Sequence, residues 1–205
     1  MYEIYINEKP LILISDDKIK NFSSKDNILL AKYPGKPKFL LNYIDMMEKG
    51  TKFDKVVLYD SDVKKIYKDL KTIASPVKAA GGIVFNNKHE LLVIFRKGFW
   101  DLPKGHIHKN EKKKDAGVRE VMEETGLENI EVFNKAGKTY HIYKNKTRHL
   151  KISYWYFMKG NQDFLTPQKE EDILEAKWVD PDDFLQSYEM YASIRKLLEN
   201  LKFKV

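Results

Sequence analysis

The 205-residue sequence contains no cysteine, and this excludes several kinds of site at once. Without thiols the chain cannot form disulfides, thiolate nucleophiles, zinc–cysteine centres or iron–sulfur clusters. Any metal must therefore be held by oxygen or histidine ligands, so the carboxylates become the residues of most interest.

Long hydrophobic runs are absent as well. No stretch reaches the roughly 20 apolar residues of a spanning helix, and Glu3 and Glu8 interrupt what would be the apolar run of a signal peptide. Apolar residues make up 42% and charged residues 33%, a balance that favours a folded, soluble chain. We expect a cytoplasmic protein without a membrane partner.

The charge is only weakly biased, with 37 Lys and Arg against 30 Asp and Glu. Of the resulting +7, residues 1–78 contribute +4 and residues 79–205 contribute +3. A nucleic-acid-binding protein would have a concentrated basic face and lose affinity steeply with salt. The scattered charges and the absence of a strong basic tail argue against such a partner.

A proline and two glycines at residues 75–82 interrupt the hydrophobic periodicity and predict a boundary. We therefore predict a small N-terminal α/β segment at residues 1–78 and a main domain at residues 79–205. No residues in this segment have a spacing typical of a catalytic site. We therefore expect the segment to serve in packing, in dimerisation or as a cover over a site. Its predicted strands lie near residues 1–6, 11–15, 27–33 and 55–60, and its helices near residues 39–50 and 62–73.

The main domain is predicted to be α+β, an α-β-α sandwich, because sheet segments are interrupted by two long helices. The helices are expected at residues 112–125 and 182–201, the second beginning with Pro181. The strands are expected near residues 81–85, 90–97, 131–145, 149–160 and 176–180.

Three glutamates on the first of these helices stand at i, i+3 and i+4: Glu120, Glu123 and Glu124. They share one stripe, and Val121 and Met122 lie roughly opposite, so we expect the glutamates to face away from the core. Such a stripe is typical of a solvated acidic face. It is equally what a site for Mg²⁺ or Mn²⁺ needs, and the spacing alone leaves both open.

The whole run from Gly105 to Leu127 reads GHIHKNEKKKDAGVREVMEETGL. It resembles the Nudix box: Gly, five residues, Glu, seven residues, Arg-Glu, an aliphatic, any residue, Glu-Glu, any residue, Gly and an aliphatic. Every fixed place is filled. The resemblance implies a Nudix-type sandwich with a mixed sheet, and an enzyme that hydrolyses a pyrophosphate bond of a nucleotide.

The resemblance also implies roles for residues of this run. The positions matching the family's ligands for one to three Mg²⁺ or Mn²⁺ ions are the carbonyl of Gly105 and the carboxylates of Glu120, Glu123 and Glu124. These ions activate water and neutralise a diphosphate. The salt bridge that orients the loop matches Arg119 and Glu111, and the spacing also lets Arg119 pair with Glu123.

The residues that lead into the box, Trp100-x-x-Pro103-Lys104, with the first two residues of the box, Gly105-His106, are similar to the dinucleoside polyphosphate hydrolase branch of the family. So are Asn145-Lys146 and Tyr154-Trp155. In that branch the matching positions touch the polyphosphate, which implies contacts from His106, Lys146 and Tyr154.

Further substrate contacts are predicted from residue type and position. Lys104 and, more weakly, Arg96 are cationic donors for phosphate, although a solvated lysine or a charged strand end would look the same. Tyr154 or Tyr140 could hold an adenine by stacking, although a cross-strand role is the commoner fate of an aromatic residue.

A general base outside the box is the last expected component. Family members often place a carboxylate before the final strand, where this chain has Glu170, Glu171 and Glu175. We favour Glu171. If none of these lies within reach of the attacking water, Glu123 is the alternative.

The sequence thus predicts a metal-dependent Nudix pyrophosphohydrolase, with a dinucleoside polyphosphate as the favoured substrate. Alternatives are hydrolysis of a nucleoside triphosphate, including an oxidised one, hydrolysis of ADP-ribose, or a nucleotide-sensing regulator without turnover. The intact box argues against the sensor. The oligomeric state stays open, with a homodimer as one option.

Overall fold

The computed structural model describes residues 1–22 and 27–201. Its internal contacts divide the chain into two compact units, each described by itself below. Unit 1 comprises residues 1–77 and 140–151, and unit 2 comprises residues 78–139 and 152–205. The sequence predicted a single division near residue 78, and so it did not assign residues 140–151 to the N-terminal unit.

Unit 1 is built on four short strands of its own. Its elements are β1 (Tyr2–Ile6), β2 (Lys9–Ile14), the 3₁₀ helix η1 (Asp16–Asn21), β3 (Ile28–Lys32), α1 (Pro37–Glu48), β4 (Lys55–Tyr59) and α2 (Val63–Ile73). The two strands predicted near residues 1–6 and 11–15 form the antiparallel pair β1–β2, whereas β2, β4 and β3 run parallel. Both predicted helices form, and each packs on the other.

The tip of a long hairpin completes unit 1. Its strands are β9 (Ile130–Lys144) and β10 (Arg148–Gly160), and β9 pairs in parallel with β1 at Ile4↔Tyr140. Arg148 donates from Nε and Nη2 to the two carboxylate oxygens of Glu48, at 2.8 and 2.7 Å, and also pairs with Asp45. Strand pairing and this charged clamp on α1 join residues 140–151 to the N-terminal elements.

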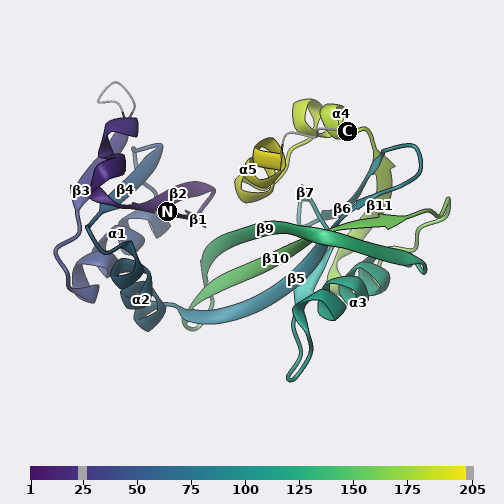
Figure 1. Cartoon of the computed structure of the whole chain (residues 1–205), viewed down its shortest axis with the longest axis horizontal. Coiled ribbons are helices and arrows are strands. Elements are labelled where there is room, and N and C mark those ends of the chain that lie inside the picture. Colours follow the sequence, from purple (N-terminus) through teal and green to yellow (C-terminus); the bar gives the residue numbers. More distant parts are fainter. Residues whose placement is uncertain (23–26, 202–205) are drawn as a thin grey trace. The chain divides into compact units, whose positions relative to one another are not determined.

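Unit 2 has the predicted layered architecture. Its sheet has the order β11-β6-β5-β10-β9, with β7 paired to β6 and β8 paired to β5. Figure 1 shows α3 on one side of this sheet and α4 and α5 on the other. The remaining elements are β5 (Ser75–Phe85), β6 (Leu91–Arg96), β7 (Phe99–Asp101), β8 (Lys104–His106), α3 (Lys113–Thr125), η2 (Lys169–Glu171), β11 (Ile173–Val179), α4 (Pro181–Ser187) and α5 (Ala192–Leu201).

Alternation along the strands produces a separate core on each face of this sheet. Ile83 and Trp155 face α4 and α5, where they pack with Phe184. Their neighbours Val84 and Tyr156 face the other way and pack against α3. The sheet is therefore covered on both faces, and the α+β sandwich with a mixed sheet is confirmed. Among the described residues, no helix combines the length and apolar character needed to cross a membrane.

The two units divide between residues 77 and 78, inside the stretch at residues 75–82, and this stretch is itself part of strand β5. Gly81 serves close packing there, because a Cβ at Gly81 would overlap the backbone of residues 103–104. One helix prediction is wrong. The expected helix at residues 182–201 is two helices, α4 and α5. The chain between them is extended, and the backbone carbonyl of Glu189 accepts a hydrogen bond from the backbone N–H of Trp100 on β7. Met190 forms an isolated β-bridge with the same residue.

Candidate active site

Helix α3 carries the three glutamates, but their surroundings differ from the prediction. Glu120 is 5% exposed and Glu124 is fully buried, whereas Met122 is 40% exposed. The expectation that the glutamate stripe faces away from the core is therefore wrong for two of its three members. The reason is that α3 packs against β8, so the chain segment around Gly105 covers that stripe. Only Glu123 is exposed.

Glu124 is held by two groups that lie N-terminal to the helix. The backbone N–H of Lys104 donates to Oε2 at 2.7 Å, and Arg96 Nη1 lies 3.4 Å from Oε1. Burial raises the pKa of Glu124 to about 7, although the charge of Lys104 and its backbone N–H both favour the carboxylate. A buried carboxylate fixed in this way can act as a metal ligand once a cation offsets its desolvation.

Arg119 organises the other carboxylates. Its Nε donates to Glu111 at 2.8 Å, and its Nη1 donates to Glu120 at 2.8 Å and to Glu123 at 2.7 Å. Nη2 reaches the carbonyl of His106 at 2.9 Å. Both predicted pairs of Arg119 are present, the one with Glu111 that the resemblance implies and the one with Glu123 that the spacing allows.

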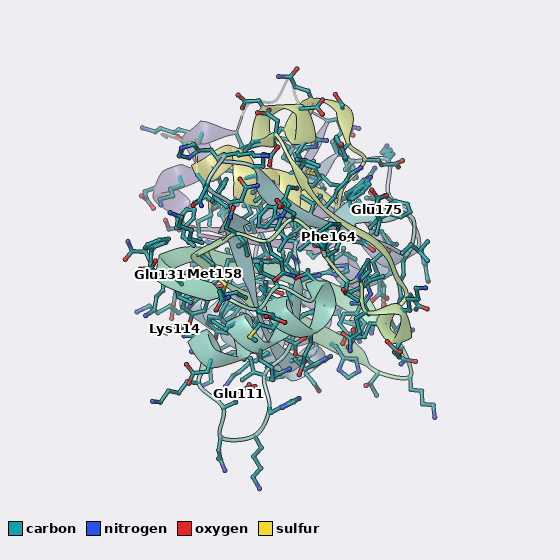
Figure 2. All side chains as sticks on the ribbon, turned by 90° about the vertical axis from the view of Figure 1, so that its right-hand side faces the viewer. Glu111, Lys114, Glu131, Met158, Phe164 and Glu175 are labelled. Atoms are coloured by element: carbon teal, nitrogen blue, oxygen red, sulfur yellow. The ribbon has the colours of Figure 1, made fainter. Side chains whose placement is uncertain are left out.

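Glu111 closes the loop that leads into α3, where Figure 2 labels it. One of its oxygens also accepts from the N–H of His108 at 2.8 Å. The hydrogen bonds from Arg119 and from this backbone N–H lower the pKa of Glu111 to about 2. The loop is therefore tied to α3 by a charge-assisted network that persists well into acid.

Gly105 provides the space for this arrangement. A Cβ at Gly105 would overlap the carboxylate of Glu120, so only glycine lets that side chain lie against the loop backbone. The donor set of carboxylates beside a backbone is the hard-oxygen chemistry that suits Mg²⁺ or Mn²⁺. Within residues 1–22 and 27–201, no three His, Asp or Glu side chains are already gathered closely enough to hold a metal ion. Glu120 and Glu123 are instead paired with Arg119, and Glu124 with Arg96.

Lys104 has a different environment from that of a solvated loop lysine. Its ammonium lies 2.5 Å from Asp101 Oδ2, and both side chains are largely buried. Burial alone would lower the pKa of Lys104, but the attraction of Asp101 and Glu124 outweighs it, so the pKa is raised. Asp101 was not among the residues predicted from the sequence. The available signal was an acid within the apolar stretch FWDLP, because a buried carboxylate needs a partner.

Arg96 contacts Glu171 as well as Glu124. Its Nη2 lies 3.2 Å from Glu171 Oε2, while Nη1 faces Glu124. The Nε of Arg96 is buried and has no hydrogen-bond partner among the described residues. The segment that precedes Glu171 is bonded to the end of α3. The N–H groups of Thr166 and Gln168 donate to the carbonyls of Thr125 and Glu124, at 2.8 and 3.2 Å. Of the three acids considered outside the box, Glu171 is the one paired with Arg96.

Of the remaining predicted substrate residues, His106 lies at this site: its carbonyl accepts from Arg119 and the residue is exposed. Tyr154 in unit 2 lies under the ammonium groups of Lys113 and Lys138, at 4.2 and 5.2 Å from its ring centroid. Tyr140 and Lys146 belong to unit 1, where Tyr140 packs edge-on against two other tyrosines.

A family model described as the NUDIX domain matches residues 75–201, and the chain belongs to the Nudix family. The family prediction is thereby confirmed, and with it the hydrolase class. The ion-pair network built on α3 lies entirely within the matched region.

Individual relatives cover parts of the chain. It is 29% identical over 127 residues to an RNA pyrophosphohydrolase of Pelagibacter ubique, a match covering 51% of this chain and 77% of that protein. It is 40% identical over 62 residues to Nudix hydrolase 8 of Arabidopsis thaliana, covering 27% of this chain and 17% of that protein. The MutT protein of Methanosarcina mazei Go1 shares the fold, with a TM-score of 0.53 at 23% identity, over 62% of this chain and 94% of that one.

Proposed function

We propose that this protein is a metal-dependent pyrophosphohydrolase that cleaves a P–O–P bond of a nucleotide, with a dinucleoside polyphosphate as the first substrate. One observation carries the proposal: the buried carboxylates of Glu120 and Glu124 lie against the Gly105 loop. The choice of substrate rests on the similarity of Trp100 to His106 to the dinucleoside polyphosphate branch.

The metal site would consist of the Gly105 carbonyl with Glu120, Glu123 and Glu124. When bound there, Mg²⁺ or Mn²⁺ supplies charge neutralisation at the phosphoryl oxygens and lowers the pKa of a water molecule. The contribution of the protein itself is to position the metal ligands. Arg119 and the N–H of Lys104 hold the carboxylates beside Gly105, and binding of the ion would require Glu120 and Glu123 to exchange Arg119 for the metal.

The general base in this proposal is Glu171. Its carboxylate is 42% exposed and is held by Arg96 beside Glu124. Burial raises the pKa of Glu120, and the charge of Glu171 adds to this effect. A base needs to be both near the site and open to water, and Glu171 meets both conditions. We expect Glu171→Gln to lower kcat by about 100-fold, whereas Glu170→Gln, an exposed neighbour on η2, leaves kcat unchanged. Equal kcat in the two variants would leave Glu123 as the base.

The reaction is tested by hydrolysis of diadenosine tetraphosphate, nucleoside triphosphates, an oxidised triphosphate and ADP-ribose, with and without Mg²⁺. We expect Mg²⁺-dependent release of ATP and AMP from the first compound. Turnover of another member of the panel would correct the substrate. A folded protein that binds Mn²⁺ and turns over none of them would favour the sensor.

A second candidate substrate is the 5′ end of an RNA. It is favoured by the relative named RNA pyrophosphohydrolase, which this chain matches over 77% of that protein's length. Release of pyrophosphate from a 5′-triphosphorylated RNA, at a rate above that for diadenosine tetraphosphate, would establish it.

A further inference from the structure

The net charge of the protein is confined to unit 1. Residues 1–77 and 140–151 carry 18 Lys and Arg against 11 Asp and Glu, whereas unit 2 carries 19 of each. The whole formal excess of +7 therefore belongs to unit 1. The hairpin tip makes the difference, because residues 140–151 add four basic residues and no acidic one. Charges that are scattered along the sequence are thus concentrated by the fold.

Within unit 1, helix α2 arranges part of this charge in a line. Lys64, Lys68 and Lys71 stand at i, i+4 and i+7 and fall within about 60° of one another around the helix axis. All three are exposed, and among the described residues none forms an ion pair. We call these three residues the α2 lysine stripe. The acid of the helix, Asp69, points elsewhere and accepts a hydrogen bond from Tyr33 at 2.7 Å.

Aromatic rings border the stripe. Tyr67, on the same face of α2, stacks on Tyr2 with ring centroids 4.1 Å apart and planes within 2°. Tyr140 packs edge-on against both rings at 5.9 Å, and the ammonium of Lys71 lies 5.0 Å from the centre of the Tyr67 ring. The three tyrosines are only partly buried. Unit 1 therefore presents a row of cations beside a group of partly exposed rings.

We propose that this face of unit 1, the α2 lysine stripe with Tyr2, Tyr67 and Tyr140, binds single-stranded nucleic acid. Lysines in a row match a phosphate backbone, and partly exposed aromatic rings offer contact to unpaired bases whatever their sequence. A bare polyanion or an anionic lipid surface would make no use of the rings. The function concerns binding by unit 1 and does not depend on the hydrolysis proposed for unit 2.

The test is binding of the full-length protein to a fluorescent, 5′-monophosphorylated RNA of about 12 nucleotides, measured by anisotropy at about 50 mM salt and above. This probe has no P–O–P bond, so a failed hydrolysis assay and a failed binding assay are distinguishable. We expect the triple variant Lys64→Gln, Lys68→Gln, Lys71→Gln to bind at least about tenfold more weakly. The slope of log affinity against log salt should fall by about 2, because each phosphate contact to a single strand contributes about 0.7.

The matched control is Lys88→Gln, Lys135→Gln, Lys159→Gln, which removes three exposed lysines from unit 2 and gives the same net charge. We expect this control to bind like the unmodified protein. Equal weakening in both triple variants would show a diffuse charge effect and overturn the proposal. So would equal affinity for inorganic polyphosphate, or binding to anionic vesicles with none to the RNA.

Discussion

The backbone N–H of Lys104 donates a 2.7 Å hydrogen bond to the buried carboxylate of Glu124. The two residues come from different elements, β8 and α3, and are 20 positions apart. This bond fixes α3 to strand β8, on which Gly105 lies. The geometry of the candidate metal site therefore depends on β8 as much as on the glutamate helix, and both can be tested.

Replacing Glu124 by glutamine should abolish turnover and leave the fold intact. The amide keeps the shape of the side chain but loses the charge that a divalent cation requires. We expect activity to fall by at least about 100-fold, and Mn²⁺ affinity to fall with it. Glu131→Gln, on exposed strand β9, is the matched control and should change neither. Metal-dependent turnover that survives in a folded Glu124→Gln protein would falsify its assignment as a ligand.

Substituting Gly105 by alanine should displace the Glu120 carboxylate, because the added Cβ would occupy its position. We expect Mn²⁺ affinity to drop by about 10- to 100-fold, the range seen when the support of a metal ligand is disturbed. The titration can be followed by the electron paramagnetic resonance of free Mn²⁺. Unchanged affinity would mean that Glu120 does not bind the metal from this position.

The buried ion pair between Asp101 and Lys104 should contribute to the free energy of unfolding. Asp101→Asn leaves a largely buried ammonium without its counter-charge, and we expect a loss of about 3 kcal/mol in the free energy of unfolding. Combining it with Lys104→Met removes both charges and should recover much of that loss. Urea denaturation of the two single variants and the double variant measures the coupling. Purely additive effects would exclude a direct pair.

Acid should weaken the clamp between the hairpin tip and α1. Hydrogen bonds from Arg148 lower the pKa of Glu48 below its ordinary value of 4.5. A lowered folded-state pKa stabilises the protein above the ordinary pKa, and this stabilisation is lost as the pH falls through the folded-state value. Arg148→Met should therefore cost stability near neutral pH and progressively less below about pH 4. Urea midpoints of both proteins across this range provide the comparison, and a difference independent of pH would contradict the assignment.

The family and its chemistry could be predicted from local sequence. The box motif fixes residue types at set spacings, and Gly126 ends α3 in the left-handed conformation that suits a helix C-cap. The Arg119 pairs are also local, since Glu123 is one helical turn away and Glu111 lies on the adjoining loop. Interactions at such short separations follow from helix geometry.

Burial at the site could not be predicted in the same way. The periodicity of α3 placed Met122 inside and Glu124 outside, and the structure reverses both. Hydrophobic patterning assumes that only apolar side chains are covered, whereas here a distant loop and Arg96 cover a carboxylate and supply its partners. Glu171 likewise reaches the site only because the segment before β11 is pinned to the end of α3.

The sequence by itself determined the kind of protein, because the Nudix motif is a contiguous run whose residue types and spacing carry the chemistry. It also determined most strands and helices, since hydrophobic alternation and helical periodicity are local. Only the tertiary structure decided which carboxylates are buried, which cations hold them, and that residues 140–151 belong with the N-terminal unit. Each of these depends on pairing between residues far apart in the chain, as in the bonds of Arg148 to Glu48, and no local pattern records such pairing.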